Sequence, residues 1–442
     1  MQLTKKMGRN APIKIEQCTL NKFFPELPKP KEHSLIKKLD QINGLSADKG
    51  YTLRMKHVGK FISRQKAKNF EREDINKITE FCHSQNPPIQ AYLTTNILIY
   101  DAELRDLERL ILEARDSKID AIIAHDLAAI KVAKRNNVKF HISTQANVSN
   151  IEAAKFYEEL GAERIILARE LSLQQIKLIK HLLKTTKIEC FIHGSMCTSI
   201  SGRCYFSAAI CDSEEFSANR GNCVQPCRRA WRVFDDESNE FIYDGQLFLN
   251  AKDLCMIEYI PELIDANIDA FKIEGRMKDP VYIKTVAQCY KEALDCFYEN
   301  TYSEEKVRSW LERLSKVFNR GFHTGFYFHR PTVKEIELEK RGNISAYKKS
   351  YLGKILSYDE NSKSANVLLE NLEDPLLLGD EIIITGPTTY MIETIKKMIY
   401  KGEKVKSITR NRYSTPVRIN LRLNTEVKTN DKIYILSKNS KL

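Results

Sequence analysis

Short apolar segments alternate with helical segments through the middle of the chain, and this alternation limits the fold more than any other feature. Runs rich in β-branched or aromatic residues occupy 89–98, 121–124, 139–143, 164–167, 188–192 and 270–273. Amphipathic helical patterns lie between several of them, at 104–114, 150–160 and 172–183. Successive strands between 119 and 192 are about 20–25 residues apart, as in repeating βα units. The pattern predicts an α/β fold, a parallel (β/α) barrel of the TIM type.

Polar residues follow the predicted strands and would surround the active-site mouth of such a barrel. Asn150 and Ser172 stand where the N-caps of two helices are expected. The candidate substrate-binding residues are His141, Thr144, Gln145, Asn147, Arg169 and Glu170. A hydrogen-bonded network that closes the barrel is the alternative role for these side chains.

The pattern changes at both ends of the chain. Residues 1–70 carry 16 Lys or Arg against five Asp or Glu, with prolines that break long elements, and form a basic, divergent segment. Residues 71–334 form the predicted barrel. Beyond 335, short strands separated by Gly, Asn or Asp predict a β-rich domain, a small barrel over 335–442, in which only 391–400 has a helical pattern.

The charge balance favours a polyanionic partner. The chain of 442 residues has 70 basic and 58 acidic residues, and seven Lys or Arg fall between 396 and 412. Nucleic acid fits this balance, although a solvated basic rim is the alternative. No apolar run approaches the roughly 18 residues of a membrane span, and the N-terminus lacks the apolar core of a signal peptide. We therefore interpret the chain as cytoplasmic, with no membrane partner.

Cysteines are concentrated in one stretch. Seven of the 11 lie between Cys190 and Cys255. In the cytoplasm, clustered cysteines are more often metal ligands or catalytic groups than disulfides. The four in the glycine-punctuated loop after the strand at 188–192 are Cys197, Cys204, Cys223 and Cys227.

Three chemistries remain open for this loop. Structural zinc prefers close pairs, and only Cys223 and Cys227 approach that spacing. An iron–sulfur cluster also needs four thiolates but tolerates irregular spacing. A catalytic thiol would need a base, and His193 is the nearest candidate. Cys190 lies within a strand, where a buried apolar role fits it better.

A second constellation follows the last predicted strand. Lys272, Glu274 and Arg276 can direct one carboxylate and two cations into the barrel mouth, a set suited to an anionic small molecule. An ordinary ion pair at a strand end is the alternative.

Several motifs together resemble one known family. Glu189 to Cys204, with Gly194-Ser-Met-Cys197 at its centre, is similar to the signature of the collagenase-like "peptidase" family, the thirty-second of the unclassified peptidases. Motifs of the same family stand in the same order at 141–147, 167–172, 217–223, 250–254, 272–277 and 319–326. The resemblance covers roughly 87–330. Within the family, the chain is most similar to the branch that hydroxylates tRNA wobble uridine and uses prephenate.

The resemblance implies an oxygen-independent RNA hydroxylase with a [4Fe–4S] cluster. It implies Cys197, Cys204, Cys223 and Cys227 as ligands, with Cys255 as the substitute for one of the last two. Lys272, Glu274 and Arg276 would bind a carboxylate-bearing co-substrate, and His193 would serve in proton transfer.

The N-terminal part departs from the family pattern. Residues 1–56 lack the apolar strand and the Pro-Ala-Gly turn with which members open, so altered N-terminal strands are expected. The prediction is hydroxylation of a tRNA wobble uridine. Its alternatives are a collagenase-like protease that uses Cys197 with His193, a ribosomal RNA hydroxylase, and a non-catalytic RNA-binding subunit.

Overall fold

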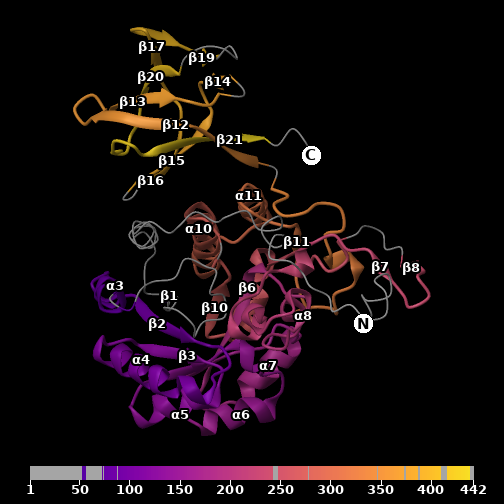
Figure 1. Ribbon diagram of the computed structural model, residues 1–442. Helices are drawn as coiled ribbons and strands as arrows, with labels where there is room; N and C mark the ends of the chain where they lie inside the picture. The colour runs from indigo at the N-terminus through magenta and orange to yellow at the C-terminus, as the bar shows by residue number, and fades with distance from the viewer. Residues whose placement is uncertain are drawn as a thin grey trace. The chain divides into compact units, whose positions relative to one another are not determined.

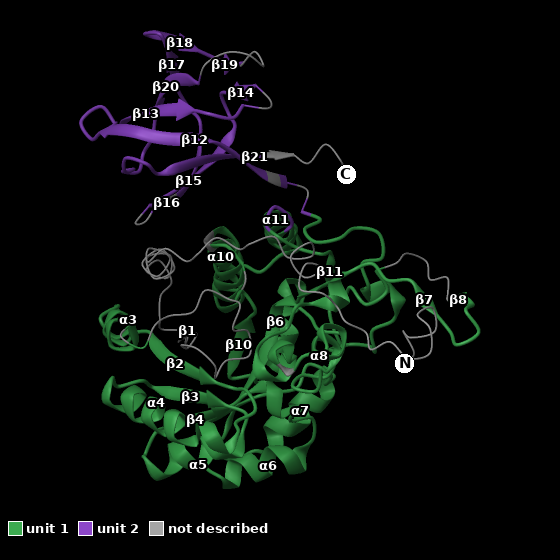
Figure 2. Cartoon of the chain, in the orientation of Figure 1, with its two compact units in different colours: residues 1–30, 45–314, 318–344 green, residues 31–44, 315–317, 345–442 purple. Residues whose placement is uncertain are grey.

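The chain forms two compact units, which Figure 2 shows in separate colours. The first comprises residues 45–314 and 318–344, and the second comprises 315–317 and 345–442, together with N-terminal stretches. The computed structural model describes residues 52–55, 72, 74–86, 88–241, 247–276, 278–345, 347–372, 375–386, 389–409 and 416–438. Of the basic segment predicted at 1–70, all but Thr52–Met55 therefore lies outside the described residues.

A run of six parallel strands is the main part of the first unit (Figure 1). They pair in chain order, which is the arrangement that repeated βα units produce. The strands are β1 (Thr52–Met55), β2 (Gln90–Thr95), β3 (Ala121–Ala124), β4 (Phe140–Ile142), β5 (Arg164–Ile166) and β6 (Lys187–Ser195). All four side chains of β3 are buried, which explains its uninterrupted apolar sequence. The predicted strands over 89–192 are confirmed, and β1 is an additional one.

Helices connect the strands, and their ends are capped as the sequence indicates. Asn150 accepts a hydrogen bond from Ala153 N at 2.9 Å, and Ser172 forms a capping box with Gln175. Both predicted caps are therefore confirmed. The helices are α3 (Asp74–His83), α4 (Leu104–Asp116), α5 (Leu127–Arg135), α6 (Ile151–Glu159), α7 (Leu173–Leu182), α8 (Phe206–Cys211), α9 (Ile260–Asp265), α10 (Pro280–Tyr298) and α11 (Glu304–Ser315).

The far side of β6 departs from a regular barrel. β10 (Ala270–Ile273) pairs with β6 in parallel, but β9 (Asp253–Cys255) also pairs with the end of β6, in the antiparallel direction. β11 (Phe322–His323) then pairs with β9. Within the described residues β1 and β10 do not pair. The parallel α/β sheet is thus confirmed, whereas closure into the predicted TIM-like barrel is not seen.

The second unit is built on an eight-stranded antiparallel sheet. The strand order is β16-β15-β21-β12-β13-β20-β17-β18, around a core that includes Ile355, Val367, Ile384, Ile419 and Ile433. β16 and β18 do not pair with each other in the described part of the chain, so the sheet is confirmed but a closed barrel is not. Its strands are β12 (Tyr347–Asp359), β13 (Ser364–Leu369), β15 (Glu381–Thr385), β16 (Tyr390–Thr394), β17 (Met398–Tyr400), β18 (Glu403–Val405), β20 (Val417–Arg422) and β21 (Lys432–Lys438).

The prediction of a helix at 391–400 is wrong. This segment contains most of β16 and all of β17, which pair with β15 and β20. Met391, Ile395 and Met398 belong to the core of the sheet, so long-range pairing overrides the local spacing. Two short ribbons complete the strands, β7 (Val233–Phe234) with β8 (Glu240–Phe241), and β14 (Leu376–Leu377) with β19 (Ser407–Ile408).

None of the helices among the described residues has the length and apolar character that crossing a membrane requires.

One hydroxyl joins α10 to β6 and to the residue that follows β9, and its removal is predicted to destabilise the first unit. Tyr290 Oη donates to Ile192 O at 2.9 Å and accepts from Met256 N at 3.0 Å. Tyr290→Phe removes both of these hydrogen bonds, while Met256 N keeps its bond to Ile192 O at 3.0 Å. At about 0.5–1.5 kcal/mol for each bond, the loss lowers the unfolding free energy by about 1–3 kcal/mol. Urea denaturation followed by tryptophan fluorescence measures it, because Trp231 and Trp310 both lie in this unit.

The control is Tyr298→Phe, whose side chain is 60% exposed at the end of the same helix. It should change the free energy by less than about 0.5 kcal/mol. Equal values for the two variants would contradict the role of the Tyr290 hydroxyl.

Candidate functional site

Four cysteines line one open pocket in the first unit. Cys197, Cys204, Cys223 and Cys227 all belong to the segment between β6 and β9. The pocket has an empty volume of about 890 Å³, which includes the solvent at its mouth. Polar residues that follow β2, β4, β5 and β10 complete its wall, namely Asn96, Thr144, Gln145, Arg169, Glu274 and Arg276. The carboxyl ends of four parallel strands and one long segment therefore meet around a single space.

Two glycines allow the cysteine segment to pack against its neighbours. Gly202 has φ +77°, and a Cβ there would lie 2.5 Å from Gln145 O. Gly194 has φ +109°, and a Cβ there would collide with Glu274 O. Both positions need a residue without a side chain, because of the left-handed backbone and the close contact together. Each glycine thus brings the cysteine segment against a neighbouring strand end.

The pocket thiols have different surroundings. Cys197 is exposed, whereas the Cys223 Sγ accepts hydrogen bonds from Ser207 Oγ at 3.7 Å and from Gln225 N at 3.4 Å. Burial raises the pKa of Cys227 to about 11. Within the described residues, no three His, Cys, Asp or Glu side chains are close enough together to hold a metal ion. The four thiols thus share one pocket, in which the other three act electrostatically on Cys227.

Arg228 ties the two ends of the cysteine segment together. Its Nη1 donates to Asn250 Oδ1 at 3.0 Å and its Nη2 donates to Met196 O. Because Met196 precedes Cys197 and Arg228 follows Cys227, this guanidinium fixes both ends of the thiol series.

A second ion pair holds the middle of the segment. Arg220 donates to both carboxylate oxygens of Glu103, at 2.6 and 2.9 Å, and its guanidinium lies 4.6 Å from the Tyr100 ring centroid. Cys204 N donates to Asn219 Oδ1 at 3.1 Å. The segment is therefore attached to the loop that follows β2.

The pocket wall carries two guanidinium groups and one carboxylate. Arg169 Nη1 donates to Ser195 O at 3.3 Å, and its guanidinium lies 4.7 Å from the Phe191 ring centroid. Glu274 accepts from the backbone N of Arg276 at 3.1 Å and lies 3.7 Å from its Nε. Two cations against one carboxylate favour an anionic ligand at this wall.

Lys272 does not line the pocket. Its Nζ is 3.9 Å from Glu189 Oε1 and 4.5 Å from the Phe191 ring centroid, and Glu189 also contacts Arg164 at 3.4 Å. Both cations thus lie beside Glu189, and all three side chains are buried. Of the predicted Lys272, Glu274 and Arg276, only the last two reach the pocket.

Three of the predicted substrate-binding residues also lie outside the pocket. His141 is completely buried, and its hydrogen bond to Glu163 lowers the pKa of that carboxyl to about 2. Asn147 has a left-handed backbone after Thr144–Ala146, and Glu170 follows the pocket residue Arg169. Thr144, Gln145 and Arg169 are the ones that line the pocket.

His193 and Cys255 pair with each other across β6 and β9, and both are buried. Nδ1 of His193 lies 3.3 Å from Tyr290 Oη, and burial lowers the pKa of the ring to about 3. Burial raises the pKa of Cys255 to about 12. Neither residue lines the pocket, whereas Cys223 and Cys227 both do.

Other residues that position the pocket were not singled out from the sequence. Arg320 Nη1 donates to Asp253 Oδ1 at 3.0 Å and to Ser195 Oγ at 3.1 Å. Arg320 and Asp253 are both buried. Asn250, Asp253 and Arg320 had a signal, because they stand in the family-like motifs at 250–254 and 319–326, and Ser195 stands in the signature from Glu189 to Cys204. Arg228 follows Cys227 and stands outside these motifs. Nothing in the local spacing indicated that these motifs contact one another.

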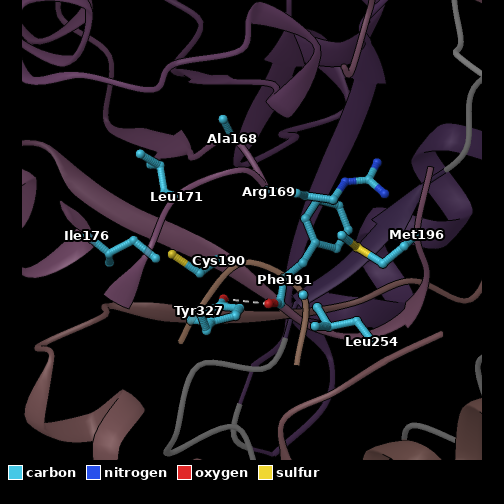
Figure 3. Close-up of a pocket in the computed structure, with 10 residues that line it drawn as sticks. Ala168, Arg169, Leu171, Ile176, Cys190, Phe191, Met196, Leu254 and Tyr327 are labelled. Carbon is cyan, nitrogen blue, oxygen red and sulfur yellow. Dashed lines mark hydrogen bonds between the residues drawn. The ribbon is translucent and has the colours of Figure 1, made fainter. Parts of the chain in front are cut away.

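A second, smaller pocket, with an empty volume of about 280 Å³ that includes solvent at its mouth, shares Arg169 and Phe191 with the cysteine pocket. Figure 3 shows Ile176, Cys190 and Tyr327 toward one end and Arg169, Phe191 and Met196 toward the other. Tyr327 Oη donates to Phe191 O at 2.6 Å. Cys190 is buried in this apolar lining, as predicted for a cysteine within a strand.

Comparison with known proteins identifies the family. The model of peptidase family U32 matches residues 46–337. The chain belongs to this family. A U32 relative from Methanocaldococcus jannaschii, named as an uncharacterized protease, is 36% identical over 381 residues, which cover 84% of this chain and 90% of the relative.

Two further U32 relatives carry different functional names. A Porphyromonas gingivalis protein named collagenase is 37% identical over 384 residues, covering 84% of this chain and 89% of that protein. The tRNA hydroxylation protein P1 of Bacillus subtilis is 33% identical over 343 residues, covering 75% of this chain and 79% of that protein. The names thus span proteolysis and RNA hydroxylation.

The buried neutral His193 is predicted to make the first unit less stable in acid. Its pKa is about 3 when folded and about 6.5 when unfolded, so below pH 6.5 the unfolded chain binds a proton that the folded chain does not. Between pH 6.5 and 5 this difference removes about 2 kcal/mol of unfolding free energy. Urea titrations at several pH values should show a shallower pH dependence in His193→Gln than in the native chain. Parallel curves would contradict this.

Proposed function

We propose that this U32 chain is an RNA-modifying hydroxylase that binds a [4Fe–4S] cluster through its four pocket cysteines and acts on a tRNA wobble uridine. The observation that carries the proposal is that Cys197, Cys204, Cys223 and Cys227 line the same pocket as Thr144, Gln145, Arg169, Glu274 and Arg276. The Bacillus subtilis relative named as a tRNA hydroxylation protein supports the choice of reaction and substrate.

The donor set fits an iron–sulfur cluster better than a single metal ion. Four thiols line one pocket, and among the described residues no three His, Cys, Asp or Glu side chains are grouped as ligands of one ion. A cluster is several ångströms across and takes one thiolate on each iron, so it suits ligands that face a common space. The hydrogen bonds to Cys223 Sγ are of the kind that tunes a bound cluster. When bound, the cluster would supply redox or Lewis-acid chemistry.

The remaining wall of the pocket suits an anionic co-substrate. Arg169 and Arg276 both reach the pocket, and guanidinium groups bind carboxylates through paired hydrogen bonds. We assign them, in place of Lys272, to a carboxylate-bearing co-substrate such as prephenate. Glu274 would orient Arg276, since the two are 3.7 Å apart.

Proteolysis is the second candidate, because relatives from Methanocaldococcus jannaschii and Porphyromonas gingivalis have protease or collagenase names. The side chains of this chain support it less well. Ser195 Oγ is hydrogen-bonded to Arg320, which cannot act as a base, and His193 is buried beside Tyr290 rather than in the pocket with Cys197. A nucleophile with an adjacent base is therefore not assembled among these groups.

The cysteine assignment predicts iron content. Protein purified without oxygen should contain about four iron and four sulfide per chain, and Cys197→Ala, Cys204→Ala, Cys223→Ala and Cys227→Ala should each lose most of it. Iron and acid-labile sulfide assays with the visible spectrum measure this.

Cys211→Ala is the matched control, because Cys211 is in the same segment at the end of α8 and does not line the pocket. Cys255→Ala separates the set of four pocket cysteines from the set in which Cys255 replaces Cys223 or Cys227. This variant should retain the iron, because Cys255 does not line the pocket. Zinc in place of iron, or iron unaffected by the four substitutions, would refute the cluster.

The reaction is tested in a strain that lacks the gene. The native chain should restore 5-hydroxyuridine in tRNA, measured by mass spectrometry of nucleosides.

Arg276→Gln should raise the co-substrate concentration for half-maximal activity in vitro about tenfold or more, because a charge-assisted hydrogen bond contributes about 1.5–3 kcal/mol. The exposed control Lys131→Ala should behave as the native chain. Hydroxylated nucleosides in ribosomal RNA alone would refute the substrate, and cleavage of protein without RNA change would favour the protease.

A further inference from the structure

One outward face of the second unit is basic. The core side chains Ile419 and Leu421 of β20 and Met398 of β17 point inward. Since side chains alternate along a strand, Arg418 and Arg422 point outward, and both are exposed. The sequence indicated positive charge in the run from 396 to 412, which includes Lys397 and Lys404 and part of which lies outside the described residues.

Strand pairing adds two lysines to these arginines. Ile399 pairs with Asn420 on one side and with Lys404 on the other, so the three share a row across β20, β17 and β18. Arg422 N donates to Lys397 O at 3.3 Å, which sets these two residues side by side in the next row. Lys404 is exposed, and Lys397 is partly exposed.

The four cations form a surface with its charge unneutralised. Within the described part of the chain, none of Lys397, Lys404, Arg418 and Arg422 forms a side-chain hydrogen bond or ion pair with another described residue. Neighbouring strands are about 5 Å apart and Arg418 lies about 13 Å from Arg422 along β20. This spreads positive charge over an area that matches several phosphate groups of a nucleic acid backbone.

We propose that this basic face, defined by Lys397, Lys404, Arg418 and Arg422, binds the phosphate backbone of the RNA that the first unit modifies. The proposal rests on the proposed function. The outward positions of these rows carry cations, Asn420 and Ile399 but no aromatic ring on which a base could stack. The face therefore holds RNA by charge, independent of its sequence, and leaves the choice of nucleotide to the pocket.

The test is RNA binding by the full chain with the variant Arg418→Thr/Arg422→Thr. Threonine suits an exposed strand position, so the sheet should be retained. The probe is unfractionated tRNA, and its affinity is measured by fluorescence anisotropy between 50 and 200 mM salt. The variant should bind more weakly, and the slope of log affinity against log salt should fall by about two, one for each lost phosphate contact.

The matched control removes two charges elsewhere. Lys131→Ala/Lys134→Ala changes two exposed lysines of α5 in the first unit and should leave the slope unchanged. Lys404→Gln, at the end strand of the sheet, provides a second variant if the double substitution does not fold, and should lower the slope by about one.

The outcomes separate this inference from the proposed function. Native affinity and slope in the basic-face variants would overturn the inference, even where the chain hydroxylates tRNA. Equal weakening by the α5 control would also overturn it, because net charge and not this face would then govern binding. A native chain that does not bind tRNA at all would overturn the proposed function together with the inference.

Discussion

The cysteine pocket depends on the hydrogen bonds that the guanidinium of Arg228 donates. One side chain joins three parts of the chain, because it donates to Met196 O, to Asn250 Oδ1 and to Ala251 O. Arginine stays charged under all ordinary conditions and offers five donors in a rigid plane, so it can hold a loop in a single geometry. The pocket wall formed by the thiols follows from this attachment and from the close packing that Gly194 and Gly202 allow.

Much of the first unit could be predicted from the sequence, because its order is local. The strands β2 to β6 are apolar runs of the right length, and helices such as α4 and α7 repeat with a period near 3.6 residues. The caps Asn150 and Ser172 act within four residues of themselves. Such signals do not depend on distant parts of the chain.

The rest depends on contacts between distant residues. β9 is three residues long and includes Asp253, whose burial requires Arg320 from another segment, so its sequence carries no strand signal. His193 and Lys272 follow the expected pattern along the chain, yet the direction of their side chains is set by Tyr290 and Glu189. The series of cysteines could be recognised from the sequence because its spacing and its glycines are local features. Which of the polar residues after the strands would line the pocket could not be predicted in this way.

The four pocket thiols come from a stretch that runs only from 197 to 227. Gathering them closes short loops, so it costs little chain entropy and adds no link between the strands that lie far apart in the chain. Their final positions are nevertheless set by Gln145 and Glu274 at the ends of β4 and β10, against which Gly202 and Gly194 pack. The thiols can therefore come near one another cheaply, but the wall takes its shape only once the parallel sheet has formed.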